Sequence, residues 1–227
     1  MKKQCNILCF GDSNTWGCCP IGSTETIERF PYIKRWPGAL SKILGSRYNV
    51  IEEGNPGRTT VLDDHFLPGK NGYDGLTICL DSHQPLELVI IMLGTNDLKY
   101  RYCMNSTDIS NGVKKLIRLI KGKCLYVGGI PNVLVIAPPT IKESSHLFGE
   151  EFLGGMEKSR KLGSEMKKVA NDEGCPYIDA SSIIESSDMD GIHFSETSHL
   201  ILAKTIAKKV VELNLVSTAY ADEMEVV

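Results

Sequence analysis

The chain has 227 residues, 25 basic and 28 acidic side chains, and a formal net charge of −3 at pH 7. This length suits one well-buried core, and we predict a single domain over residues 1–227 with a frayed acidic tail at about 219–227. The near balance of charge gives no electrostatic reason to expect nucleic acid or an anionic membrane as a partner. We therefore expect a small-molecule partner.

The first residues show no sign of export. Lys2 and Lys3 precede an apolar segment, as in a secretory signal, but residues 5–10 are too few to form its apolar region. The 8 cysteines lack C-x-x-C pairs and His/Cys ligand spacing, so neither a disulfide framework nor a zinc site is expected. We expect a cytoplasmic protein with reduced thiols, no membrane contact, and no metal or other cofactor.

Predicted strands and helices alternate along the chain. Short apolar segments bounded by glycine, proline or polar residues predict strands at 7–10, 48–53, 86–93, 133–137 and 177–179. Helical spacing and helix-end signals predict helices at 37–44, 73–81, 113–120, 155–172 and 200–210. Strands separated by helices imply right-handed crossovers, so the expected fold class is α/β, with a five-stranded parallel sheet between two helical layers.

Two helix starts and one long loop complete this prediction. Ser195 is expected to cap the last helix, and Ser106 or Thr107 the helix through 113–120. Pro138-Pro139 ends the fourth predicted strand, and the segment from there to Phe152 has no clear periodicity, which is typical of a loop. We expect the segment 140–155 to act as a lid or a contact surface.

Polar and glycine residues follow three of the predicted strands at the point where each strand ends. Ser13 follows the first strand, the loop 54–57 follows the second, and Asn96 follows the third. In an open parallel sheet the carboxyl ends of the strands share one edge, where ligands bind. These residues are therefore expected to form one site.

A serine hydroxyl attacks a carbonyl only when a base takes its proton and an acceptor orients that base. Asp190 and His193 are three positions apart around Gly191, which permits the turn that would bring them together. The transition state also needs donors for its oxyanion. The backbone N–H groups of Ser13 and Gly57 and the side-chain amide of Asn96 would supply them, with Asp97 holding the Asn96 loop.

Four blocks in this order resemble the SGNH (GDSL) hydrolase superfamily: Gly11-Asp12-Ser13, Gly57, Gly94-Thr95-Asn96-Asp97 and Asp190-Gly191-Ile192-His193. The resemblance covers almost the whole chain. It implies a flavodoxin-like sheet, Ser13 as nucleophile, Asp190 and His193 as acid and base, and Gly57 and Asn96 in the oxyanion hole. Gly54 is an alternative to Gly57 as the oxyanion-hole glycine, but the Arg-Thr-Thr sequence that follows Gly57 favours Gly57.

Residues 11–17, 51–60 and 152–160 are similar to the arylesterase-like branch of that superfamily. This resemblance implies a serine esterase or thioesterase that works without a metal. Such enzymes are often oligomers, so the resemblance also allows a homo-oligomer. Asn14 departs from the name-giving motif, which has leucine at this position, and so affects the shape or the polarity beside the nucleophile rather than the chemistry.

Candidate substrate-binding residues are the polar Asn14 and three aromatic residues, Trp16, Phe148 and Phe152. Trp16 is favoured among the aromatics because it lies beside the nucleophile. Plain core packing is the alternative for each aromatic residue.

The predicted function is a serine esterase that hydrolyses short-chain acyl or aryl esters. A carbohydrate O-acetylesterase, an acyl-CoA thioesterase and a lysophospholipase use the same triad and remain alternatives. A non-catalytic flavodoxin-like binding domain is an alternative of another class. If His193 is the base, activity is expected to fall as the pH drops through about 6.5.

Overall fold

A computed structural model of the chain describes residues 4–22, 26–123, 126–143 and 148–215. The predicted acidic tail lies outside these residues. Five parallel strands form one sheet in the order β2-β1-β3-β4-β5. The strands are β1 (Cys5–Gly11), β2 (Tyr48–Gly54), β3 (Leu88–Met92), β4 (Asn132–Ala137) and β5 (Tyr177–Asp179).

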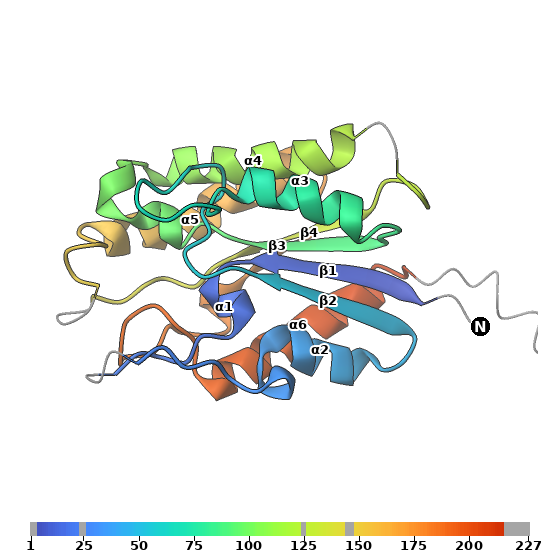
Figure 1. Cartoon of the computed structure of the whole chain (residues 1–227), viewed down its shortest axis with the longest axis horizontal. Helices are drawn as coiled ribbons and strands as arrows, with labels where there is room; N and C mark the ends of the chain where they lie inside the picture. Colours follow the sequence, from blue (N-terminus) through green and yellow to red (C-terminus); the bar gives the residue numbers. More distant parts are fainter. Residues whose placement is uncertain (1–3, 23–25, 124–125, 144–147, 216–227) are drawn as a thin grey trace, which may run out of the picture.

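Helices cover both faces of the sheet (Figure 1). Helices α3, α4 and α5 lie on one face, and α2 and α6 lie on the other. The short α1 lies at the carboxyl end of β1. The helices are α1 (Ser13–Trp16), α2 (Trp36–Leu44), α3 (Gly72–Ser82), α4 (Ser106–Gly122), α5 (Gly155–Asp172) and α6 (Glu196–Glu212).

The alternation of side chains along β1 shows why a single strand can support two cores. Leu8 and Phe10 pack with the apolar faces of α3, α4 and α5, whereas Ile7 and Cys9 pack against α2 and α6. Successive side chains of a strand point to opposite faces of the sheet, so a strand that is apolar at every position must be covered on both sides. The continuous apolar runs of the sequence therefore specify the three layers.

The sheet order places the end of β1 at the point where the strand order reverses. From β1 the chain crosses to β2 at one side of the sheet, and then returns to β3 on the other side of β1. Gly11, the last residue of β1, pairs with Gly54 of β2 and Met92 of β3. The loops after these three strands thus leave the sheet side by side, at the crevice where open α/β sheets bind ligands.

The fold class predicted from the sequence is confirmed, and each predicted strand and helix is present within a few residues of its expected position. Ser195 caps α6 as expected. The predicted cap of α4 is wrong: Asn105 is the N-cap and forms a capping box with Asp108. Helix α1 was not expected, because four residues are too few to show a periodic pattern.

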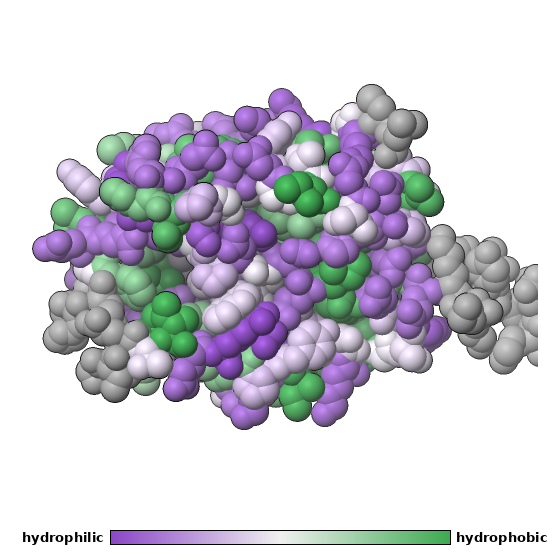
Figure 2. Space-filling view, in the orientation of Figure 1, coloured by the Kyte–Doolittle hydropathy of each residue, from purple (hydrophilic) through white to green (hydrophobic). Residues whose placement is uncertain are grey.

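The face of the molecule shown in Figure 2 is mainly polar. Figure 2 shows hydrophilic side chains over most of the visible face, with apolar side chains scattered among them. Among the residues described above, no helix has both the length and the apolar character needed to cross a membrane.

We predict that Leu116→Ala destabilises the protein by about 2 to 5 kcal/mol, because it opens a cavity in the core between α4 and the sheet. The Leu116 side chain is fully buried there. Asn111→Ala, at an exposed position of the same helix, should change the free energy of unfolding by about 0.5 kcal/mol or less. Urea unfolding of the two variants beside the wild type measures both values. Equal losses would show that Leu116 makes no special contribution to the core.

Candidate active site

Ser13 is the first residue of α1, and only Asp12 separates it from the end of β1. The carboxylate of Asp12 caps this helix by accepting the Asn14 N–H at 2.9 Å. Gly17 ends the helix in the left-handed conformation, at φ 89°, which is unfavourable for other residues. The Ser13 side chain is held in this tight turn and is 8% exposed.

The structure brings Ser13, His193 and Asp190 into one continuous chain of hydrogen bonds. His193 Nε2 lies 3.1 Å from Ser13 Oγ, and His193 Nδ1 lies 2.7 Å from Asp190 Oδ2. The other carboxylate oxygen accepts the backbone N–H groups of Ile192 and His193, and Ile21 N–H binds Oδ2. The three predicted residues therefore have the geometry of a nucleophile, a base and an orienting acid.

The His193–Asp190 pair changes the acidity of both groups. Burial by itself lowers the pKa of His193, but the hydrogen bond that the imidazole donates to Asp190, the neighbouring Cys18 sulfur and the Asp190 charge raise it to about 9. Burial raises the pKa of Asp190, but the imidazole and the backbone N–H donors leave it below the ordinary value. Asp190 is therefore ionised near neutral pH and stabilises the protonated imidazole.

Gly57 and Asn96 lie on the loops after β2 and β3, beside the end of β1. Gly57 has a φ of 81°, a conformation that favours glycine. Asn96 Nδ2 donates to the backbone carbonyl of Arg58 at 3.1 Å, which joins the two loops. Among the described residues, no acceptor binds the backbone N–H of Ser13 or Gly57. These N–H groups are free to bind an oxyanion.

Two further contacts hold the oxyanion loops. Asp97 accepts the Thr60 N–H at 3.0 Å and also binds the Thr60 hydroxyl, so it ties the loop after β3 to the loop after β2. Arg58 Nη1 donates to the Gly11 carbonyl at 2.8 Å, and its guanidinium lies 4.1 Å from the centre of the Phe10 ring. No sequence pattern indicates this Arg58 contact, because the partner is a backbone atom of a distant strand.

Gly54, the rival to Gly57, has a packing role in the structure. A Cβ atom at Gly54 would lie 2.1 Å from the backbone nitrogen of Trp16. The absence of a side chain therefore lets α1 pack directly against the end of β2.

The predicted substrate-binding residues occupy different environments. The centroids of the Phe148 and His193 rings are 6.1 Å apart, in an edge-to-face arrangement. The Phe152 ring packs against Phe148 in the same way, with their centroids 6.2 Å apart. Trp16 is partly exposed, with the Arg29 guanidinium 4.5 Å from its ring centre. Of these three aromatic residues, Phe148 makes the ring contact with His193, whereas the sequence favoured Trp16.

Asn14 is buried beside the nucleophile, and its substrate-binding role stays a prediction. Its side chain is 2% exposed, and both ends of its amide are hydrogen-bonded to the backbone around His193. The predicted lid or contact segment 140–155 includes residues 144–147, which lie outside the described residues. Its role as a lid or contact surface stays a prediction.

One group of side chains has the composition of a metal site. Among the described residues, ligand atoms of Glu53, Cys79 and His83 lie within 4.8 Å of one another. However, His83 Nε2 already binds Glu53 at 2.7 Å. The positive charge of the Arg58 guanidinium also acts on Cys79, where it opposes the rise in the pKa of the thiol that burial causes. This positive charge disfavours a cation, so we assign the group no metal.

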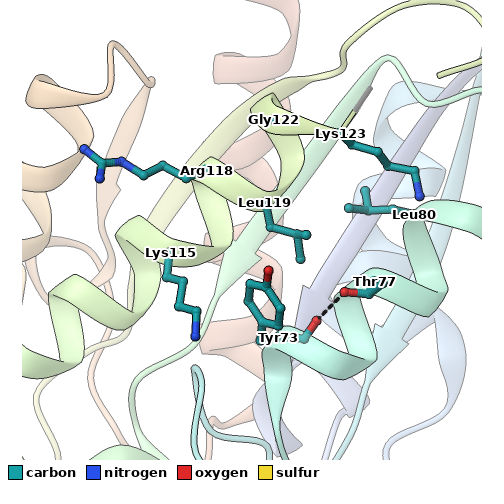
Figure 3. A pocket seen from close by; sticks show the side chains of 8 residues that line it. All are labelled: Tyr73, Thr77, Leu80, Lys115, Arg118, Leu119, Gly122 and Lys123. Atoms are coloured by element: carbon teal, nitrogen blue, oxygen red, sulfur yellow. Dashed lines mark hydrogen bonds between the residues drawn. The ribbon is translucent and has the colours of Figure 1, made fainter. Parts of the chain in front are cut away.

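A groove of about 410 Å³ lies between α3 and α4 (Figure 3). It contains none of the predicted site residues. Its basic side chains already have partners: Lys123 binds Asp81, Arg118 binds Glu173, and Lys115 lies over the Tyr73 ring. Two of these three basic side chains are therefore already paired with carboxylates.

Solved structures of known proteins match this chain in both sequence and fold, whereas a comparison with curated proteins finds no match. A carbohydrate acetylesterase from Sinorhizobium meliloti, Est24, is 40% identical with a TM-score of 0.88, covering 92% of this chain and 100% of its own. An aryl esterase from M. smegmatis is 39% identical with a TM-score of 0.89, covering 92% and 99%.

A third similar structure is a putative arylesterase from Agrobacterium tumefaciens str. C58, at 34% identity and a TM-score of 0.84, covering 92% of this chain and 99% of its own. Residues 9–201 match the sequence model of a single family, and this match spans the three strand-end loops and the Asp190–His193 turn. The resemblance predicted from the sequence is thereby confirmed: the chain belongs to the GDSL-like Lipase/Acylhydrolase family.

Proposed function

We propose that the chain hydrolyses short-chain acyl or aryl esters through an acyl-enzyme on Ser13. The observation that carries this proposal is the continuous hydrogen-bond chain from Ser13 through His193 to Asp190, at the edge where the oxyanion donors also lie. Similarity to an aryl esterase and to a carbohydrate acetylesterase supports the same reaction class.

In the first half of the reaction, His193 Nε2 takes the proton of Ser13 Oγ as that oxygen attacks the ester carbonyl. The N–H groups of Ser13 and Gly57 and the amide of Asn96 stabilise the negative charge on the carbonyl oxygen. His193 then gives its proton to the leaving alcohol, and the ester bond breaks. In the second half, His193 activates water in the same way, which releases the acid and restores Ser13.

A carbohydrate O-acetylesterase is the second candidate, because Est24 is 40% identical and bears that description. The triad serves both substrate classes equally, so the pocket decides between them. A panel of acetyl, butyryl and long-chain aryl esters, acetylated sugars and acyl-CoAs separates these activities from a thioesterase or lysophospholipase. Turnover of acetylated sugars well above that of aryl acetates would favour the second candidate.

We also propose that the enzyme acts as one domain in the cytoplasm, on small-molecule esters and without a nucleic-acid partner. One five-stranded sheet with two adjoining cores supports a single domain. The cysteines within the described residues are free thiols, which suits a reducing compartment. A homo-oligomer stays part of the proposal, and light scattering of the purified chain tests it.

We predict that Ser13→Ala lowers the hydrolysis of a chromogenic short-chain aryl ester by at least about 1000-fold, because it removes the nucleophile. Ser164→Ala, at an exposed position of α5, is the matched control and should keep wild-type activity. A fluorophosphonate should label the wild type and the control but not Ser13→Ala. Wild-type activity in Ser13→Ala would exclude Ser13 as nucleophile, and an unlabelled, folded wild type would favour the non-catalytic binding domain.

The pH dependence should follow the protonation of His193. The imidazole is a base only when neutral, and Asp190 raises its pKa, so kcat/KM should rise with a midpoint above the ordinary value of about 6.5. This replaces the midpoint expected from the sequence alone. Asp190→Asn removes the stabilising charge and should lower both the midpoint and the rate. Measurement of kcat/KM from pH 5 to 10 tests this, and a wild-type midpoint at or below 6.5 contradicts it.

We predict that Asn96→Ala lowers kcat by about 100- to 1000-fold with little change in KM, because its amide acts on the oxyanion of the transition state. Asn132→Ala, at an exposed position at the start of β4, should leave kcat unchanged. Steady-state kinetics with the same aryl ester measure both. A rise in KM at constant kcat would instead place Asn96 in ground-state binding.

A further inference from the structure

Asn14 follows the nucleophile directly and is almost completely buried, with 2% of its surface exposed. Its backbone N–H binds the Asp12 cap, so the start of α1 determines the direction of its side chain. A buried amide is stable only when its donor and acceptor are both satisfied.

The amide of Asn14 meets the two peptide groups that flank His193. Its Nδ2 donates to the Ile192 carbonyl at 3.3 Å, and its Oδ1 accepts the Phe194 N–H at 3.2 Å. These partners lie 178 and 180 residues away in the sequence. The residue beside the nucleophile therefore binds the backbone on both sides of the base.

The other backbone contacts of the segment 190–194 come mainly from residues outside α1. Asp190 accepts the His193 N–H at 2.9 Å, Ser187 N–H donates to the His193 carbonyl at 2.9 Å, and Lys142 N–H donates to the Gly191 carbonyl at 2.8 Å. Ile21 N–H, from the segment after α1, binds Asp190 at 2.8 Å and so holds the acid. The Asn14 bonds are thus a direct link from the nucleophile's helix to the backbone next to the base.

We propose that Asn14 is a positioning residue that holds His193 Nε2 at hydrogen-bond distance from Ser13 Oγ through these two bonds. The proposal rests on the function proposed above. It also explains the polar residue at the position of the motif's leucine: a leucine here would leave the Ile192 carbonyl and the Phe194 N–H without their partner. Aspartate would keep an acceptor for Phe194 but would present a second acceptor to the Ile192 carbonyl.

The test compares Asn14→Leu and Asn14→Ala with the wild type, using the chromogenic aryl ester and the rate of fluorophosphonate labelling. Both variants lose both bonds, so kcat and the labelling rate should fall by about 10- to 100-fold, because small errors in the position of reacting groups are costly. KM should stay unchanged. The pH midpoint should stay near the wild-type value, because Asp190 still binds His193 Nδ1.

Asn105→Ala provides the matched control for stability. It removes the capping box of α4, which lies in a different part of the fold, and it should lower the melting temperature without lowering kcat. A wild-type kcat in either folded Asn14 variant would overturn the proposal. A rise in KM alone would also overturn it and would favour the substrate-binding role predicted from the sequence.

Two outcomes separate this inference from the proposed function. If Ser13→Ala keeps its activity, the proposed function fails whatever the Asn14 variants do. If Ser13→Ala is inactive and the Asn14 variants keep the wild-type kcat, the function stands and only the positioning role fails. Should Asn14→Leu fail to fold, the smaller Asn14→Ala still gives the comparison.

Discussion

Asp190 is fully buried, and its carboxylate accepts three backbone N–H groups and the imidazole of His193. A buried carboxylate without such donors would carry a large desolvation penalty. Its donors come from its own turn and from Ile21, in the segment that follows α1. The requirement to satisfy this one charge therefore folds the turn 190–193, orients the base and brings that turn to the nucleophile's side of the molecule.

The remaining parts of the site are joined by contacts between loops rather than by regular structure. Asn96 binds the carbonyl of Arg58, Arg58 binds the carbonyl of Gly11, and Asp97 binds Thr60. The Arg58–Gly11 bond connects the ends of the neighbouring strands β2 and β1, and the other two bonds connect the loops after β2 and β3, the two strands that flank β1, so the rigid sheet determines the spacing of the loops. Such preorganisation matters because oxyanion donors act without further rearrangement only when their positions are already set.

The sequence predicts the fold and the candidate triad well, because both depend on local patterns. Apolar runs mark strands that are covered on both faces, and a polar residue after each run marks the sheet edge. The cap of α4 was misplaced because Asn105 adjoins two other good capping residues. The bonds of Asn14 and the contact of Phe148 with His193 had no local signal, since they depend on how distant segments pack.

Three buried carboxylates at this edge of the sheet differ in charge because their partners differ. Burial raises the pKa of Asp12 and of Asp97 to about 6, with backbone N–H groups and a hydroxyl as their hydrogen-bond donors. Asp190 alone binds an ionisable ring, and its pKa is lowered. The backbone N–H groups that bind Asp12 and Asp97, and the Thr60 hydroxyl at Asp97, oppose this rise, because hydrogen bonds donated to a carboxylate favour its charged form. Negative charge is therefore strongest at Asp190, where proton transfer from Ser13 creates the imidazolium that this charge stabilises.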